Sequence, residues 1–323
     1  MFDIIVFGSA TRDVFMQSSE FKTKEDQSSP SGRILDFPLG MKLSVDKLVL
    51  TTGGGGTNAA VTFARQGMDT CCIGVVGSDA NGDAILRELE EEGVNVKYFD
   101  RHDDDLTAYS VILVQDTGER TILSYKGEGQ HFSHTEVKFE ELESKWVYCD
   151  SLGGSYELML KIIEHSQKTG ARLATNPGTK ELLHGWDKLV PLMQAADIFS
   201  FNKEEAQELA GVKGREELFN KLRETIKGIV VVSDGNKGVT VLDTDGNSHT
   251  AGVPDSPVVE RTGAGDAFGS GFVTEYMRSG DITKAIQFGT ANASSVVTQF
   301  GAKAGILKKD DWGPWPLVEV VMA

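Results

Sequence analysis

A glycine-rich turn followed by an aspartate stands at the start of one predicted helix, in the segment VVERTGAGDAFGSGFVTEYM at 258–277. The backbone amides of Gly263, Ala264 and Gly265 can approach an anion closely, because no large side chain intervenes and the positive end of the helix dipole lies there. Asp266, in the first turn, can accept a proton from an attacking alcohol. The pattern predicts a phosphate site with a base beside it. An ordinary glycine turn, with an acidic residue against the helix dipole, is the alternative.

A second glycine cluster lies in TTGGGGTNAAVTFARQG at 51–67. Four successive glycines before a helix cost chain entropy, so this position needs unusual dihedral angles or a close approach of the backbone to a ligand. We favour the ligand; a flexible turn in which Asn58 caps the helix is the alternative. Asp13, after the first predicted strand, can accept two hydroxyl hydrogens from a diol, which suits a polyol. A solvent-facing loop aspartate would give the same pattern.

Both glycine segments resemble one protein family. TGAGD followed by AF is similar to the C-terminal signature of the ribokinase-like (PfkB) carbohydrate kinases, and the four-glycine run resembles their N-terminal signature. The resemblance implies that Asp266 is the catalytic base and that the three amides before it form an anion hole. The residues implied to hold the acceptor hydroxyls are Asp13, Gly54, Gly55 and Asn58.

The segment departs from the family just upstream of the turn. Members often carry Asp-Thr before the Thr-Gly, whereas Glu260 and Arg261 occupy those places here. In relatives that depend on a monovalent cation, that aspartate helps to bind potassium. The departure puts activation by K⁺ in doubt, but not catalysis.

FNKEEAQELAG at 201–211 contains Asn202 and Glu205 at the spacing of a helix capping box, in which each residue bonds the backbone amide of the other. The family resemblance gives the same spacing a second role, in which Asn202 contacts the nucleotide and Glu205 helps to organise Mg²⁺. Magnesium prefers oxygen ligands and retains water, so the two roles are compatible.

Two further segments resemble the ATP-binding parts of the family. VVVSDGNKGV at 230–239 resembles the strand and glycine loop that hold phosphates and ribose, with Ser233, Gly235 and Gly238 at the matching places; a plain β-turn is the alternative. FGTANASSVVTQFGA at 288–302 resembles the helix against adenine, with Thr290 rather than Asn292 in register. ATP is therefore the expected donor.

The order of elements predicts an α/β fold. Short β-branched runs alternate with amphipathic helical stretches, which implies a parallel sheet. The resemblance implies a ribokinase-like three-layer sandwich with a central, mostly parallel sheet and a small β-sheet lid. Gly67 and Gly93 stand where helices end. Strands are expected at 3–7, 70–76, 146–149, 171–175, 196–201 and 229–233, with helices at 57–67, 81–93, around 158–166 and twice before 227.

Two segments interrupt this alternation. YSVILV and RTILSY, at 109–114 and 120–125, flank a turn built on Asp116 and Gly118 and predict a β-hairpin. Residues 14–52 could form a linker or a disordered loop, but we favour a lid, because a loop this long inside a compact domain is usually functional. We expect one ribokinase-like domain over 1–323, with a discontinuous lid from about 14–52 and 105–127; the role of 17–45 stays open.

Composition excludes several classes of function. With 32 basic and 48 acidic residues in 323, the net charge of -16 disfavours nucleic acid and anionic membranes as partners. Three cysteines, two of them adjacent, form neither a disulfide framework nor a metal-ligand spacing, which indicates a reducing compartment. The start MFDIIVFGSA has no basic region of a signal peptide and no span of about 20 apolar residues occurs, so a cytoplasmic location is expected. The P-loop and G-x-G-x-x-G dinucleotide motifs are missing.

These patterns together predict an ATP-dependent kinase that transfers the γ-phosphate to a hydroxyl of a sugar or sugar-like compound. A nucleoside kinase of the same fold, or a binding protein that has lost catalysis, are the alternatives, and the sequence does not select the acceptor. The resemblance implies that a homodimer can form through the lid, and the apolar residues of the 109–125 hairpin, which would be exposed without a cover, favour it.

Overall fold

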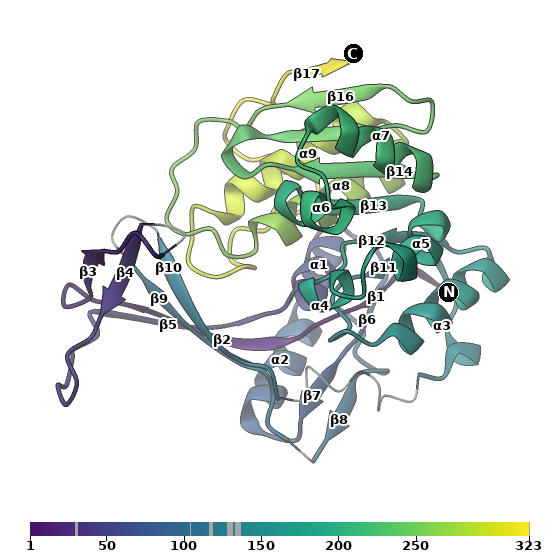
Figure 1. The fold of residues 1–323 in the computed structure, drawn as a ribbon. Coiled ribbons are helices and arrows are strands. Elements are labelled where there is room, and N and C mark those ends of the chain that lie inside the picture. Colours follow the sequence, from purple (N-terminus) through teal and green to yellow (C-terminus); the bar gives the residue numbers. More distant parts are fainter. Residues whose placement is uncertain (30–31, 104, 116–118, 128–131, 133–136, 323) are drawn as a thin grey trace.

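The computed structural model describes residues 1–322 apart from 30–31, 104, 116–118, 128–131 and 133–136. Its centre is a nine-stranded sheet in the order β17-β16-β15-β14-β13-β12-β11-β1-β6 (Figure 1). Neighbours from β6 to β14 pair in parallel, and the remaining three strands are antiparallel. The strands are β1 (Phe2–Phe7), β6 (Thr70–Ile73), β11 (Ser144–Cys149), β12 (Arg172–Thr175), β13 (Ile198–Asn202), β14 (Ile229–Ser233), β15 (Val239–Leu242), β16 (Ser248–Ala251) and β17 (Val320–Met322).

Helices cover both faces of this sheet, which gives three layers (Figure 1). One face packs against α1 (Gly55–Arg65), α2 (Ala80–Glu91), α8 (Ala264–Ser279) and α9 (Ile282–Val296). The other packs against α3 (Tyr156–Thr169), α5 (Trp186–Ala195), α6 (Lys203–Ala210) and α7 (Arg215–Thr225). Short helical turns occur at α4 (Thr179–Leu182), η3 (Phe139–Glu141) and η4 (Gly235–Lys237).

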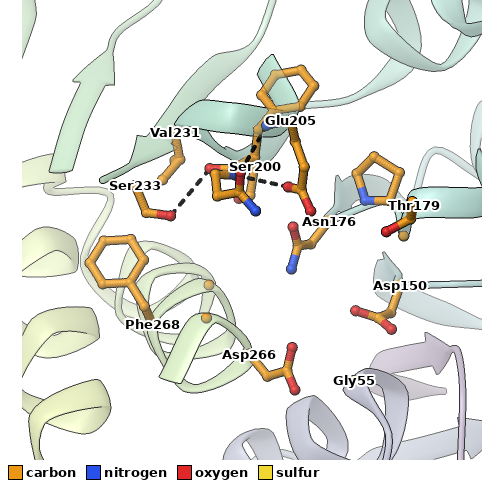
Figure 2. A pocket seen from close by; sticks show the side chains of 16 residues that line it. Gly55, Asp150, Asn176, Thr179, Ser200, Glu205, Val231, Ser233, Asp266 and Phe268 are labelled. Carbon is orange, nitrogen blue, oxygen red and sulfur yellow. Dashed lines mark hydrogen bonds between the residues drawn. The ribbon is translucent and has the colours of Figure 1, made fainter. Parts of the chain in front are cut away.

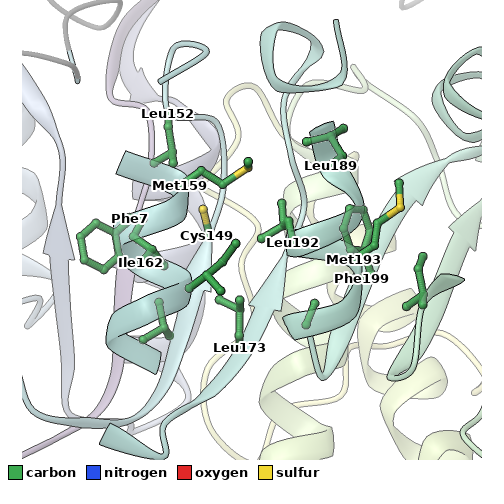
Figure 3. Close-up of a cluster of buried hydrophobic side chains, with 14 of the residues drawn as sticks. Phe7, Cys149, Leu152, Met159, Ile162, Leu173, Leu189, Leu192, Met193 and Phe199 are labelled. Carbon is green, nitrogen blue, oxygen red and sulfur yellow. The ribbon is translucent and has the colours of Figure 1, made fainter. Parts of the chain in front are cut away.

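The parallel strands are apolar on both faces because each face is covered. In β1, Ile4 and Val6 belong to one hydrophobic core, whereas Ile5 and Phe7 belong to the other. Successive side chains of a strand point to opposite faces, so a continuous apolar run feeds both layers. Figure 3 shows the core beneath α3 and α5, where Phe7 lies beside Ile162 of α3 and Phe199 lies beside Met193 of α5. This packing holds the carboxyl ends of the strands in fixed positions.

A second, four-stranded sheet projects from the main body as a lid, in the order β10-β9-β2-β5 (Figure 1). It consists of β2 (Thr11–Gln17), β5 (Lys47–Gly53), β9 (Tyr109–Val114) and β10 (Arg120–Tyr125). Strands β9 and β10 pair antiparallel at the predicted positions, while the turn predicted at Asp116 and Gly118 lies outside the described residues. Further two-stranded pairs join β3 (Lys22–Glu25) to β4 (Arg33–Asp36) and β7 (Val75–Gly77) to β8 (Asp100–His102).

At three places the structure differs from the sequence-based expectation by more than small shifts at the ends of elements. The strand expected over 70–76 is divided at Gly74 into β6 and β7, and β7 pairs with β8. The helix expected over 288–302 is the C-terminal part of α9, which ends at Val296. Asp13 lies within lid strand β2 rather than in a loop after β1. None of the described helices is long and apolar enough to cross a membrane.

Candidate active site

A cavity of about 310 Å³ lies at the carboxyl ends of the parallel strands, the edge where α/β sheets bind ligands. Its walls come from residues that follow or end β11, β12, β13 and β14, and from the amino ends of α1 and α8 (Figure 2). Three carboxylates line it, and no lysine, arginine or histidine is found among the described lining residues. An anionic ligand must therefore be held by backbone amides or arrive with a cation. The carboxylates are Asp150, Glu205 and Asp266.

The amino end of α8 opens into this cavity. Gly263, the residue before the helix, has φ 78, a left-handed conformation that glycine adopts without strain. A Cβ at this position would also lie 2.4 Å from the Cβ of Ala302. Within the described part of the chain, no side chain caps this end of the helix. Its first-turn amides, beside Gly265 in the cavity wall, can therefore serve an anion.

The second glycine cluster is required by close packing of the backbone. A Cβ at Gly56 would lie 2.6 Å from the Cα of Gly8, and one at Gly55 would lie 2.3 Å from Oδ1 of Asp150. Gly54 has φ 95, and the amide of Gly55 donates to Oγ of Ser9. The run therefore lets α1 begin directly against the end of β1. Of these glycines, Gly55 lines the cavity.

The two glycine-rich segments meet at Asp266. The side-chain amide of Asn58 donates a 2.7 Å hydrogen bond to Oδ2 of Asp266, so Asn58 does not act as a helix cap. Its Oδ1 is buried and has no partner among the described residues. Burial raises the pKa of Asp266, while the Asn58 hydrogen bond and the charge of Lys303 oppose that rise. Figure 2 shows Asp266 facing the same space as Asp150 and Asn176.

Asp150 and Asn176 were not selected from the sequence. They directly follow β11 and β12, and both line the cavity. Burial raises the pKa of Asp150 well above its usual value, and the nearby charge of Asp266 adds to the rise. The sequence feature that could have identified them is their position directly after two buried parallel strands, since the carboxyl ends of such strands meet at one edge of the sheet.

Asp13 lies beside the cavity lining, on the lid strand β2. It is 5% exposed and is paired in register with Thr51 and Ser110. A Cβ at Gly53 would lie 1.9 Å from its Oδ2, so that glycine makes room for the carboxylate. Burial raises the pKa of Asp13, while a hydrogen bond from Ser110 and the charge of Lys303 oppose the change. The aspartate is therefore a buried polar group and not a solvent-facing loop residue.

Asn202 and Glu205 form the capping box, and both line the cavity. The amide of Glu205 donates to Oδ1 of Asn202 over 2.8 Å, and the amide of Asn202 donates to Oε2 of Glu205 over 2.9 Å. Burial raises the pKa of Glu205, and the contacts with Asn202 lower it. The structural role is thus present, and the carboxylate still faces the site.

The remaining residues predicted to bind the nucleotide lie partly inside and partly outside the cavity lining. Ser233 lines the cavity, whereas Gly235, the first residue of η4, and Gly238, the residue after it, lie outside the described lining. Gly238 has φ 96, and a Cβ there would lie 1.9 Å from the carbonyl oxygen of Ala251. Thr290 is buried outside the lining, and its hydroxyl donates to the carbonyl of Ile286, so its nucleotide contact stays a prediction.

Glu260 is fully buried at the base of the glycine turn. Its Oε2 accepts from the amide of Thr262 at 2.6 Å, and its Oε1 accepts from the amide of Gly301 at 3.2 Å. The carboxylate thus joins the turn before α8 to the loop after α9. Both of its oxygens are already engaged by backbone N–H groups.

Comparisons with known proteins identify the family of this chain. Residues 1–309 match the pfkB family carbohydrate kinase. A ribokinase from Haemophilus influenzae is 29% identical over 276 residues, which are 83% of this chain and 88% of that protein. A nucleoside kinase from Methanothermobacter thermautotrophicus is 24% identical over 255 residues, 79% of this chain and 81% of that protein.

The fold has solved counterparts as well. The structure of Arabidopsis thaliana ribokinase complexed with ribose and ATP superposes with a TM-score of 0.74 at 22% identity, covering 94% of this chain and 95% of that one. The ribokinase-like sandwich expected from the sequence is thereby confirmed. The chain belongs to the pfkB family of carbohydrate kinases, and it is a phosphotransferase.

Proposed function

We propose that this kinase transfers the γ-phosphate of ATP to a hydroxyl of a sugar, with Asp266 as the base. The observation that carries the proposal is the convergence of Asp266, the uncapped end of α8 and Gly55 on one cavity. In the step, Asp266 accepts the proton of the acceptor hydroxyl, whose oxygen forms a bond to the γ-phosphorus. The bond from that phosphorus to the β-phosphate oxygen breaks, and ADP leaves.

The amides of Gly263, Ala264 and Gly265 would stabilise charge on the transferred group. They need no reorganisation during the reaction, because the start of α8 is fixed by packing against α9 and α1. Positioning and preorganised electrostatics are thus the main contributions expected of this protein.

The acceptor would be held by polar groups near Asp266. Of these, Asp150 lines the cavity, while Asn58 and Asp13 lie outside its described lining. The unpartnered Oδ1 of Asn58 can accept a hydroxyl hydrogen, and the carboxylates of Asp150 and Asp13 can each accept two. Gly54 and Gly55 would bring the backbone close to the ligand. A compound with several neighbouring hydroxyls fits this set of acceptors.

Mg²⁺ fits the residues present. Among the described residues no group of three or more His, Cys, Asp or Glu could hold a metal alone, but Glu205 and Asn202 place oxygens in a cavity whose described lining has no basic side chain. Magnesium is commonly held by one or two carboxylates together with substrate phosphates and water. When bound, it would neutralise charge on the phosphates of ATP. Glu205 and Asn202 are the residues proposed to hold it.

We do not expect activation by K⁺. The support is Glu260, which stands where cation-dependent relatives carry an aspartate and whose oxygens accept from Thr262 and Gly301. The carboxylate therefore joins the two loops through its own hydrogen bonds.

A sugar is favoured over a nucleoside because of the lid. Phe15 lies on the same face of β2 as Asp13, but it is 1% exposed and packs edge-to-face against Phe300, with ring centroids 6.2 Å apart. The ring of Phe15 is therefore covered and does not offer a stacking surface for a base, whereas the polar Ser110 is paired with Asp13.

The lid is also the proposed dimer interface, within a single domain that spans the chain. Strands β5 and β10 expose apolar side chains on one face of the lid, with exposed fractions between 47% and 58%. A cover from a second copy would bury them. A cytoplasmic location is supported by the free, buried cysteines. The exposed lid residues are Leu48, Leu50, Leu123 and Tyr125.

The test is ADP release with ATP and Mg²⁺ over a panel of pentoses, hexoses, sugar acids, sugar phosphates and nucleosides. Neutral sugars should give the highest kcat/KM. Asp266→Asn should then lower kcat by about 10³-fold or more while ATP still binds in calorimetry. Unchanged turnover in this variant would remove the base assignment.

A further inference from the structure

Lys303 is a buried cation that the catalytic proposal does not use. It lies in the loop after α9 and is 2% exposed. Its Nζ donates a 2.5 Å hydrogen bond to Oγ1 of Thr52 and stands 4.0 Å from Oε1 of Glu88 on α2. Taking an ammonium group out of water costs several kcal/mol of folding free energy unless neighbouring groups compensate the charge, so the neighbours of this lysine must stabilise it.

The ion pair with Glu88 compensates only part of this cost. It is long at 4.0 Å, and the Glu88 side chain is 30% exposed. The shorter contact is with Thr52, directly before Gly53, the residue that touches the carboxylate of Asp13. The lysine thus holds the end of lid strand β5 where the glycine run begins.

The charge of Lys303 also reaches the two carboxylates that matter for catalysis. It opposes the effect of burial on the pKa of both Asp13 and Asp266. In turn, burial lowers the pKa of Lys303, and the acidic groups around it oppose the change. The groups around Lys303 are Glu88 from α2, Asp13 from β2, Cys72 from β6 and Asp266 from α8.

We propose that Lys303 is a positioning residue for phosphoryl transfer: it fixes the end of lid strand β5 through Thr52 and places a buried positive charge beside the acidic groups of the site. The inference rests on the proposed function. A buried cation at this place lowers the cost of ionising the neighbouring carboxylates before the nucleotide and its cation arrive. Besides Lys303, the hydrogen bond from Asn58 on α1 favours the ionised form of Asp266. The charge of Asp266 in turn raises the pKa of Tyr148 on β11, of Asp150 in the following loop and of Glu205 on α6.

The test removes the charge of Lys303. Lys303→Met keeps the length of the side chain and removes its charge, so the acid limb of kcat/KM should move to higher pH. If the limb moves by one pH unit, kcat/KM falls tenfold at pH values on the limb and by less at pH 8. Lys145→Met, which breaks an exposed pair with Asp3 far from the site, should leave the limb in place.

A purely structural lysine gives a different result. In that case Lys303→Met lowers Tm and kcat but leaves the limb in place, which would overturn the proposal. If Lys303→Met fails to fold, the variants Lys303→Arg and Thr52→Val test the proposal instead. The arginine should retain the wild-type limb, and Thr52→Val should raise the KM for the acceptor without moving the limb.

Carboxylate titrations by ¹³C NMR separate this inference from the proposed function. If the wild-type protein phosphorylates none of the acceptors tested, the proposed function fails. The Asp13 and Asp266 resonances should still titrate at higher pH in Lys303→Met than in wild type. Identical titrations in the two proteins would reject the role of Lys303, whatever the activity.

Discussion

The side-chain amide of Asn58 donates a 2.7 Å hydrogen bond to Oδ2 of Asp266, and so joins the first turns of α1 and α8 across 208 residues of sequence. Each residue belongs to one of the two glycine-rich segments. The bond has one consequence for geometry, since it fixes the carboxylate, and one for charge, since it favours the ionised form of Asp266. Both can be tested by substitution.

Asn58→Ala should lower kcat/KM by roughly 10- to 100-fold, because Asp266 loses a buried donor and the acceptor loses the contact with Oδ1. The pKa of Asp266 should rise when the hydrogen bond is removed, so the loss should be larger at pH 6 than at pH 8. Steady-state rates across this range provide the measurement. A loss that is independent of pH would mean that Asn58 does not act on the protonation of Asp266.

Gly55→Ala should disable the acceptor site, because the new Cβ would lie 2.3 Å from Oδ1 of Asp150. Either α1 or the carboxylate must move, and a displacement of this size costs roughly 10²-fold in kcat/KM. Initial rates at varied acceptor concentration measure it. Gly214→Ala is the matched control, since its Cβ would meet nothing closer than 3.8 Å. Equal kinetics for the two variants would speak against a narrow acceptor site at Gly55.

Asp150→Asn should make the protein more stable and less active. Burial and the charge of Asp266 raise the pKa of Asp150 in the folded state, so the folded protein binds this proton more tightly than the unfolded chain does. Stability is therefore lost as pH rises from the unfolded pKa through the folded pKa. Above the folded pKa, the ionised carboxylate carries its full cost.

The asparagine avoids this cost, so the Tm of Asp150→Asn should exceed that of wild type by several degrees at pH 8, on the order of 1 kcal/mol or more. The difference should shrink toward pH 4. Scanning fluorimetry over this range tests it, with the exposed Asp69→Asn as the control. A variant that is less stable than wild type at pH 8 would show that hydrogen bonds to the carboxylate outweigh its desolvation.

Replacing K⁺ by tetramethylammonium should leave turnover unchanged, because the Glu260 carboxylate already accepts from the amides of Thr262 and Gly301. Glu260→Gln should lower both kcat and Tm, since one of these amides loses its acceptor at a cost of about 1–3 kcal/mol. The paired assays are ADP release in each salt and thermal melting. Strong stimulation by K⁺ in wild type would refute this account of Glu260.

Leu50→Lys and Leu123→Lys should each convert a dimer into monomers, because both place a charge on the exposed apolar face of the lid. Leu183→Lys is a fitting control, since Leu183 is 74% exposed outside the lid. Light scattering gives the mass. A wild-type protein that is monomeric at high concentration would contradict the proposed dimer.

The sequence predicted the parts of the site in which backbone geometry restricts the residue type. Gly53 to Gly56 and Gly263 could be found because a Cβ at any of them would collide with a neighbour or meet a left-handed φ. The lid hairpin could be found because its strands alternate and pair at the expected positions.

Residues fixed only by tertiary packing could not be found in this way. Asp150 and Asn176 are single polar residues after apolar strands, and many loops begin in this manner. Lys303 looks like a surface lysine until the loop after α9 is seen to fold against Thr52. The register assigned to Thr290 gave no information on the direction of its hydroxyl, which bonds within its own helix.

The short loop from Gln299 to Lys303 touches the lid and the glycine turn at once. Phe300 packs against Phe15 in the lid, and the amide of the next residue, Gly301, donates to Glu260 beneath the turn. This loop therefore joins the lid to the glycine turn. A tilt of the lid that carried Phe300 with it would shift Gly301 and Glu260 beneath the amides proposed to receive the phosphate, so binding of one substrate should alter the binding site of the other.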